Sequence, residues 1–194
     1  MFTGIIESLT TITHLETEGT NLHLTFARPN GWDLKVDQSV AHNGVCLTVI
    51  ALTETTYTLT AVAETLEKTT LGNLAVGDVV NVERCMPAHG RFDGHIVQGH
   101  VDQKGKVESV TDQNGSWLVE FSYQPDSQHI VVEKGSICVN GVSLTAFNAV
   151  ENKFTVTIIP YTWEHTNFHT LKAGTEVNLE FDIIGKYVAR LMGK

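Results

Sequence analysis

Two strings of the sequence carry the side chains best suited to chemistry. Residues 39–48 read S-V-A-H-N-G-V-C-L-T, and residues 136–145 read S-I-C-V-N-G-V-S-L-T. Each string places small hydroxyl or thiol groups on a strand pattern that is otherwise apolar. Thiols and hydroxyls become nucleophiles when a base lies next to them, so Cys46 and Ser143 are candidate nucleophiles. The alternative for Cys46 is a buried cysteine that acts only as a small apolar side chain.

A histidine distinguishes the second half of the chain from the first half. When the halves are aligned, His100 falls opposite Ile5, so a titratable group stands where the related position is apolar. Histidine changes its charge near neutral pH and is the most frequent general acid or base. We therefore predict that His100 transfers protons, with a structural role at the end of a strand as the alternative.

The segment around this histidine is dense in possible metal ligands: His89, Asp93, His95, His100 and Asp102. His95 and His100 are five residues apart and no third ligand stands at a fixed spacing, so we predict no metal site. The glycines of the segment are not followed by G-K-[ST], so it is not a phosphate-binding loop. The three cysteines lack metal-ligand spacing and are odd in number, which argues against a disulfide framework.

Two more differences between the halves are weaker candidates. Asp182 aligns with Cys85, and Lys134 aligns with Asp37. Charged residues at such positions are more often solvated surface groups than ligand contacts.

A duplication that spans the chain gives each of these residues an equivalent position in the other half. The two strings are 97 residues apart, and near the start of the chain the spacing is 95, so that Gly4 aligns with Gly99. Register held over so long a span is typical of a duplicated folding unit. We expect one domain over residues 1–94, a second over 95–182 and a C-terminal segment over 183–194.

The elements of each half are predicted to be mainly strands. Short runs rich in Val, Ile, Thr and Phe are separated by Gly, Asn and Asp, which indicates an all-β fold. Asn-Gly pairs begin at residues 43, 114 and 140 and predict tight turns, because both residues tolerate positive φ. Residues 63–74 and 160–171 predict a short helix or turn.

The last twelve residues predict an amphipathic helix. Ile184, Val188 and Leu191 fall on one face, with Lys186 and Arg190 elsewhere. Such a face must pack on a barrel or on another copy of the chain, and we prefer the second.

Composition excludes several classes of function. The chain has 194 residues and a net charge of −9 without runs of Lys or Arg, which argues against binding to nucleic acid. No apolar run approaches the length that spans a bilayer, and the N-terminus does not read as a signal peptide. We expect a soluble cytoplasmic protein with no membrane association.

Several strings occur together and in order: M-F-T-G-I-I-E, S-V-A-H-N-G-V-C-L-T, E-T-L-E-K-T-T-L-G, G-H-I-V-Q-G-H-V-D and V-N-G-V-S-L-T. With them the whole chain resembles the riboflavin synthase family. The resemblance implies two tandem six-stranded antiparallel Greek-key barrels and a C-terminal α-helix that helps to assemble a homotrimer, with the active site between subunits. It implies dismutation of two 6,7-dimethyl-8-ribityllumazine molecules to riboflavin and 5-amino-6-ribitylamino-2,4(1H,3H)-pyrimidinedione, without a metal or redox cofactor.

The resemblance also implies two substrate pockets. The residues expected in the first pocket are Gly4, Ile5, Ile6, Ser39, Cys46, Leu47, Thr48, Thr60, Ala61, Val62, Ala63, Glu64 and Thr65. Those expected in the second are Gly99, His100, Val101, Lys134, Ser143, Leu144, Thr145, Thr157, Ile158, Ile159, Pro160, Tyr161 and Thr162. Strand backbone would pair with the pyrimidine edge, and hydroxyls would suit the ribityl chain. Catalysis would rest on His100 for proton transfer and on Cys46, Ser143 or water as nucleophile.

A protein that binds lumazine or flavin without turnover, as the related lumazine proteins do, is the competing function. Both N-G-V-[CS]-L-T strings are intact in this sequence, which favours the enzyme. A flavin-dependent reductase would need a nicotinamide-binding domain, for which the chain has no room.

Overall fold

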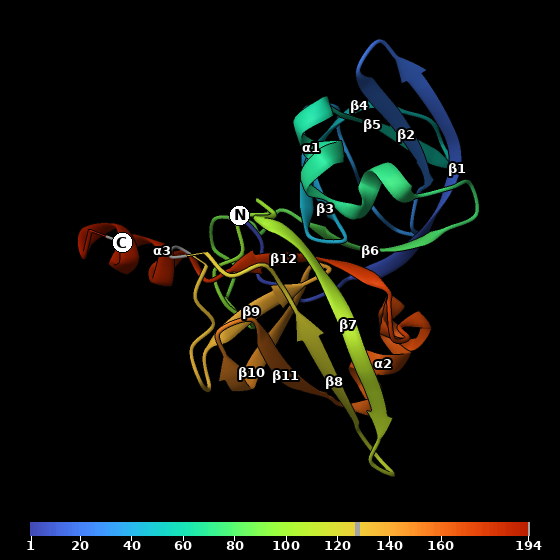
Figure 1. Ribbon diagram of the computed structural model, residues 1–194. Helices are drawn as coiled ribbons and strands as arrows, with labels where there is room; N and C mark the ends of the chain where they lie inside the picture. Colours follow the sequence, from blue (N-terminus) through green and yellow to red (C-terminus); the bar gives the residue numbers. More distant parts are fainter. Residues whose placement is uncertain (127–128, 194) are drawn as a thin grey trace.

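The computed structural model describes residues 1–126 and 129–193, which form two closed six-stranded antiparallel barrels (Figure 1). Barrel 1 has the strand order β1-β2-β5-β4-β3-β6 and barrel 2 the order β10-β11-β8-β7-β12-β9. Since corresponding strands are neighbours in both barrels, the predicted duplication and the Greek-key double barrel are confirmed. The strands of barrel 1 are β1 (Ser8–Glu18), β2 (Asn21–Ala27), β3 (Ser39–His42), β4 (Val45–Leu52), β5 (Thr56–Ala61) and β6 (Val79–Arg84). Those of barrel 2 are β7 (Gln103–Asp112), β8 (Trp117–Ser122), β9 (Ser136–Val139), β10 (Val142–Val150), β11 (Lys153–Ile158) and β12 (Glu176–Phe181).

Strand alternation fills the inside of each barrel with apolar side chains. On β5, Tyr57, Leu59 and Ala61 are fully buried, while Thr58 and Thr60 between them face outward. Barrel 2 repeats this with Phe154, Val156 and Ile158 on β11 and other buried residues. The barrels are therefore packed cores, and ligand chemistry must take place on their outer surfaces.

The two predicted helix-or-turn segments each divide into two short helices. In the first, α1 (Ala63–Lys68) precedes the 3₁₀ helix η1 (Thr70–Asn73), and in the second, α2 (Pro160–His165) precedes η2 (Asn167–Thr170). The Thr69 hydroxyl accepts a hydrogen bond from the Leu71 N–H, and Thr166 does the same for Phe168. A capping threonine therefore divides each segment.

Two of the predicted Asn-Gly turns meet where the barrels touch. Asn43 and Gly44 join β3 to β4 with φ of 45° and 81°, and Asn140 and Gly141 join β9 to β10 with 46° and 83°. A Cβ on Gly44 would lie 2.8 Å from the Gly141 nitrogen, so only glycine allows this approach.

Buried asparagine amides tie the barrels together around these turns. The Asn81 side chain donates to the Asn140 carbonyl, and the Asn178 side chain donates to the Asn43 carbonyl, each at 2.9 Å. Asn167 donates to the Asn43 side chain at 3.0 Å. A buried amide without a partner is costly, so these bonds favour one relative placement of the barrels.

The start of the chain lies between the barrels (Figure 1). Phe2 and Val97 form an antiparallel bridge with hydrogen bonds of 2.7 and 3.1 Å in the two directions. The proposed domain boundary at residues 94 and 95 lies between the end of β6 and the start of β7. Helix α3 (Ile183–Leu191) follows barrel 2 and lies at the edge of the molecule (Figure 1), with Ala189 buried and Lys186 donating to Asp102 at 2.7 Å.

Candidate functional site

Barrel 1 carries Ser39, Cys46 and Thr48 on the outer face of the β3–β4 hairpin. In the strand register Ser39 pairs with Thr48, and Ala41 pairs with Cys46. Leu47, between Cys46 and Thr48, points into the core. We call this outer surface, together with residues 98–101 described below, the barrel 1 site.

Barrel 2 repeats the arrangement on the β9–β10 hairpin. Thr145 pairs with Ser136, and Ser143 pairs with the buried Cys138. The Ser143 side chain is half-buried and Thr145 is exposed. We call this surface, together with residues 3–6, the barrel 2 site.

The segment that completes each site comes from the start of the other repeat. The Cys46 N–H donates to the Gly99 carbonyl at 2.8 Å, and the Ser143 N–H donates to the Gly4 carbonyl at 2.8 Å. Ile6 packs against the core of barrel 2, and Val101 packs against the core of barrel 1.

The expected grouping of residues into two pockets is therefore wrong within one chain. Repeat alignment put Gly4, Ile5 and Ile6 with Cys46, and Gly99 to Val101 with Ser143. The two segments instead cross at the Phe2–Val97 bridge, so each leaves its own barrel and packs on the other.

His95 is a partner of Ser143 that sequence reasoning missed. Its Nδ1 lies 2.6 Å from the Ser143 Oγ, and its ring is half-buried. Burial lowers the pKa of His95, and the charge of nearby Asp182 opposes that shift. Asp182 also caps α3, because its side chain accepts from the Ile184 N–H at 2.9 Å. The barrel 2 site thus holds a hydroxyl beside an imidazole that is neutral at pH 7. The only sequence signal for His95 was the H-x₄-H spacing, which raised a metal site as a possibility that we did not favour, and nothing in the sequence related His95 to Ser143.

The thiol of Cys46 occupies the corresponding place in the barrel 1 site. Burial raises the pKa of Cys46, while a hydrogen bond from Ser39 lowers it. Cys85 lies close enough to raise this pKa further, and its own Sγ is 4.0 Å from the Met1 amine. Because the thiol rather than the thiolate is favoured, Cys46 needs a base before it can act as a nucleophile.

His100 belongs to the barrel 1 site, although it was expected with Ser143. It follows Gly99 directly, and its backbone N–H donates to the carboxylate of Glu180 at 3.0 Å. The residue itself is exposed. The structure thus separates the two histidines, with His95 at Ser143 and His100 on the segment that contacts Cys46.

The remaining predicted residues lie around these hairpins. The side chains of Leu47, Ala61 and Ile158 point into the barrel cores, so only their backbone is available to a ligand on the outer face. Thr60 accepts or donates a hydrogen bond with His23 at 2.9 Å. The exposed members of the predicted set are Ile5, Thr48, Val62, Ala63, Glu64, His100, Lys134, Thr145, Thr157, Ile159, Pro160 and Tyr161, and the half-buried ones are Ile6, Ser39, Cys46, Thr60, Thr65, Val101, Ser143, Leu144 and Thr162.

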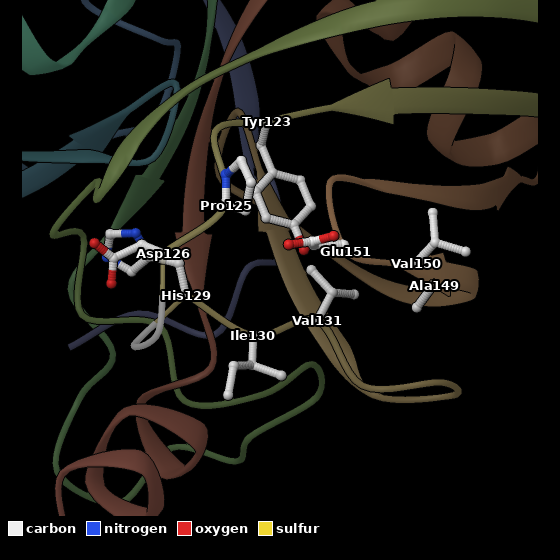
Figure 2. A pocket seen from close by; sticks show the side chains of 9 residues that line it. All are labelled: Tyr123, Pro125, Asp126, His129, Ile130, Val131, Ala149, Val150 and Glu151. Atoms are coloured by element: carbon white, nitrogen blue, oxygen red, sulfur yellow. The ribbon is translucent and has the colours of Figure 1, made fainter. Parts of the chain in front are cut away.

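Two hollows adjoin the sites. One of about 450 Å³ is lined by Thr3, Ile5, Gln38 and Cys85 among others, and one of about 390 Å³ by Ser136, Asp182 and apolar residues of α3. A larger hollow of about 590 Å³ lies elsewhere on barrel 2. Figure 2 shows the side chains that line it, which include none of the predicted site residues: Tyr123, Pro125, Asp126, His129, Ile130, Val131, Ala149, Val150 and Glu151.

Metal-ligating side chains do not converge in the described part of the chain: no group of three or more His, Cys, Asp or Glu residues is placed to hold an ion. Among residues 1–126 and 129–193, no helix has the length and apolar character to cross a membrane.

Comparison with known proteins gives the same two units. The lumazine binding domain model matches residues 3–85 and 98–182. Riboflavin synthase of Actinobacillus pleuropneumoniae is 40% identical over 195 residues, which cover 100% of this chain and 91% of that protein. Riboflavin synthase of Bacillus subtilis is 39% identical with the same coverage. The crystal structure of LumP complexed with riboflavin superposes with a TM-score of 0.86 at 22% identity, covering 93% of this chain and 99% of that one.

Proposed function

This chain belongs to the riboflavin synthase family, and we propose that its two outer-face sites each hold one molecule of 6,7-dimethyl-8-ribityllumazine. The protein is a transferase that moves a four-carbon unit from one lumazine to the other. The products are riboflavin and 5-amino-6-ribitylamino-2,4(1H,3H)-pyrimidinedione. The observation that supports two lumazine positions is the repeated outer-face hairpin, with Cys46 in one copy and Ser143 in the other.

Duplication suits a reaction between two copies of one compound. Donor and acceptor have the same shape, so one ancestral pocket repeated in the chain can bind both. Holding two reactants in contact and in the right orientation can lower the activation barrier by roughly 7–11 kcal/mol. Differences between the copies then determine which lumazine donates and which accepts.

Nucleophilic activation is assigned to the barrel 2 site in this proposal. The Ser143 hydroxyl passes its proton to the His95 Nδ1 as its oxygen bonds to a carbon of the electron-poor ring of one lumazine. The π bond at that carbon opens, and its electron pair moves into the conjugated ring system. The 2.6 Å separation of these atoms and the lowered pKa of His95 support this role. Cys46 and water are the alternative nucleophiles.

Proton removal from the ring methyl of the second lumazine is assigned to His100. This residue lies on the segment that contacts Cys46, and histidine is the most frequent general acid or base in enzymes. The outward Ser39 and Thr48 hydroxyls would bind the ribityl chain, and the exposed backbone near Val62 would bind the pyrimidine edge.

Incubation of the purified protein with the lumazine tests the function. Appearance of riboflavin absorbance together with release of the pyrimidinedione supports the synthase. A stable lumazine complex without riboflavin would instead support a binding protein, which the fold similarity to LumP makes the second candidate.

Replacing His100 by alanine should lower kcat by about 10²–10⁴-fold while lumazine still binds, because the group that accepts the methyl proton is lost. Steady-state rates and equilibrium binding of lumazine measure the two effects. His14→Ala, which removes an exposed histidine of β1, is the control. Full turnover of the His100→Ala variant would exclude His100 from the chemistry.

A homotrimer is also part of the proposal, with α3 in the contact between chains and the active site formed by neighbouring subunits. On α3, Ile184, Val188 and Leu191 are 61%, 50% and 86% exposed, so its apolar face is uncovered within one chain. A cytoplasmic location is proposed as well, supported by the three free thiols.

Leu191→Lys should reduce the mass in solution from three chains to one, because a charge would be buried in the contact. Arg190→Lys, at the neighbouring exposed position, should leave the mass unchanged. Analytical ultracentrifugation distinguishes the outcomes. A wild-type protein that sediments as a single chain would refute the trimer without affecting the fold.

A further inference from the structure

Two buried glutamates occupy the same position in the two barrels. Glu83 on β6 and Glu180 on β12 are only 5% and 3% exposed. Carboxylates are seldom so buried unless they are paired or hydrogen-bonded. No cation contacts either carboxylate within hydrogen-bond distance in the described residues; the donors are backbone N–H groups and, for Glu83, the Thr3 hydroxyl.

Glu180 holds the segment that completes the barrel 1 site. Its Oε1 accepts from the Gln98 N–H at 2.6 Å, and its Oε2 accepts from the Gly99 and His100 N–H groups at 2.9 and 3.0 Å. The Gly99 carbonyl in turn accepts from Cys46. A residue of barrel 2 therefore places His100 and Gly99 against barrel 1.

Glu83 makes the mirror-image arrangement. Its Oε1 accepts from the N–H and hydroxyl of Thr3 at 2.6 and 2.8 Å, and its Oε2 accepts from the Gly4 N–H at 3.0 Å. The Gly4 carbonyl accepts from Ser143. Here a residue of barrel 1 places the wall of the barrel 2 site.

We propose that Glu180 and Glu83 are positioning residues that act crosswise: Glu180 orders the barrel 1 site and Glu83 orders the barrel 2 site. The proposal rests on the function given above, since it concerns the same two sites. Neither carboxylate needs to touch the lumazine, because each acts through a backbone segment that does.

The pKa of Glu180 makes the position of segment 98–100 depend on pH. Lys186 on α3 lowers its pKa, whereas Asp102 raises it, and the thiols of Cys46 and Cys138 also face it. Burial dominates and raises the pKa of Glu180 to about 7.

Protonation of Glu180 removes hydrogen-bond acceptor capacity, so the segment 98–100 should loosen as the pH falls below about 7. The folded chain holds this proton more tightly than the unfolded chain, whose glutamate pKa is 4.5, so ionised Glu180 makes stability fall as pH rises from 4.5 to 7.

Glu180→Gln tests the proposal, because the amide keeps the shape but turns a donor toward the backbone N–H groups. In the full-length protein without ligand, hydrogen exchange of residues 98–100 should accelerate at least tenfold, while the amides of Thr3 and Gly4 keep the wild-type rate. Alkylation of Cys46 by iodoacetamide, separated from Cys85 by peptide mapping, should accelerate too. With lumazine, kcat/KM should fall about 10- to 100-fold, mainly through kcat.

Glu83→Gln is the reciprocal variant and should accelerate exchange of the Thr3 and Gly4 amides while residues 98–100 keep the wild-type rate. Glu54→Gln removes a charge in the exposed β4–β5 turn, away from both sites. It should leave the exchange rates of both segments unchanged. The stability of the wild-type minus that of Glu180→Gln should decrease as the pH rises from 4.5 to 7, which a residue that only fills space would not cause.

Two results would overturn the proposal: unchanged exchange at residues 98–100 in Glu180→Gln, or faster exchange there with wild-type kcat/KM. If Glu180→Gln does not fold, exchange of the wild-type protein at pH 5.5 and 8.5, corrected for the intrinsic rate, gives the same decision. Exchange and alkylation require no turnover, so a wild-type protein that forms no riboflavin would refute the proposed function separately.

Discussion

Gly99→Ala should lower kcat/KM by about a hundredfold or more, because its added methyl group has no space. A Cβ at this position would lie 2.5 Å from the Cys46 Cβ and 3.1 Å from the Cys46 nitrogen. Both contacts are with atoms fixed to the backbone, so relief requires the 98–101 segment to move away from the barrel 1 site. Displacement of a catalytic group by about 1 Å is enough for a hundredfold loss. Lumazine turnover and Cys46 alkylation measure the change.

The control for Gly99 must separate crowding from backbone strain. Gly99 has φ of +81°, which costs any L-residue about 1–2 kcal/mol. Gly31 has φ of +77°, but a Cβ there would meet no heavy atom of the described residues within 4 Å, so Gly31→Ala carries the strain alone. Gly31→Ala should lose some stability but keep full kcat/KM. Equal kinetic losses in the two variants would contradict the close approach of Gly99 to Cys46.

Tyr57→Phe should destabilise barrel 1 by about 1–3 kcal/mol, because a buried imidazole would lose its partner. The Tyr57 hydroxyl lies 2.8 Å from the His42 Nε2, and the His42 Nδ1 lies 3.2 Å from the Val40 carbonyl. Both side chains are fully buried, and His42 also packs on Phe26 with ring centroids 4.5 Å apart. Urea unfolding at pH 7.5 measures the loss.

Acid should destabilise barrel 1 through the same pair. Burial lowers the pKa of His42 to about 3, whereas the unfolded chain takes up this proton near 6.5. Between these values the unfolded state binds more protons at His42, so the contribution of His42 to stability is complete above pH 6.5 and falls by about 1.4 kcal/mol for each pH unit below it. Glu180 contributes a slope of opposite sign between pH 4.5 and 7, so the His42 slope is the difference between unfolding curves of the wild-type and of a variant without His42 at pH 7.5, 5.5 and 4.5.

Barrel 2 supplies the matched control, since Val139 and Phe154 stand where barrel 1 has His42 and Tyr57. The double variant His42→Val/Tyr57→Phe removes both polar groups together. It should recover much of the stability that Tyr57→Phe loses and should lack the His42 part of the acid slope. An unchanged slope in the double variant would show that other groups cause the acid sensitivity.

The order of elements followed from local signals that act over a few residues. Alternation of Thr58 and Thr60 with Tyr57, Leu59 and Ala61 defined a strand with one buried face. Asn-Gly pairs defined the hairpin turns, because positive φ is a local requirement. The same alternation placed Cys46 and Thr48 on one face without reference to any tertiary contact.

Residues that act across the interface carried no such signal. His95 is separated from Ser143 by 48 residues and Glu180 from Gly99 by 81, so no local period relates them. Glu83 and Glu180 were visible only as matched positions of the repeat. An acid on a strand ordinarily indicates a solvated face, and here the barrel contact buries it.

Sequence alone therefore determined the duplication, the strands, the turns, the outward hydroxyls of both hairpins and the outward thiol of Cys46, because these depend on short-range sterics and side-chain alternation. Only the tertiary structure decided which site is completed by residues 3–6 and which by residues 98–101. Repeat alignment pairs residues by ancestry and placed Gly4 with Cys46 and Gly99 with Ser143. The Phe2–Val97 bridge and the two buried glutamates exchange those segments between the barrels, since packing and hydrogen bonding act between residues that are close in space.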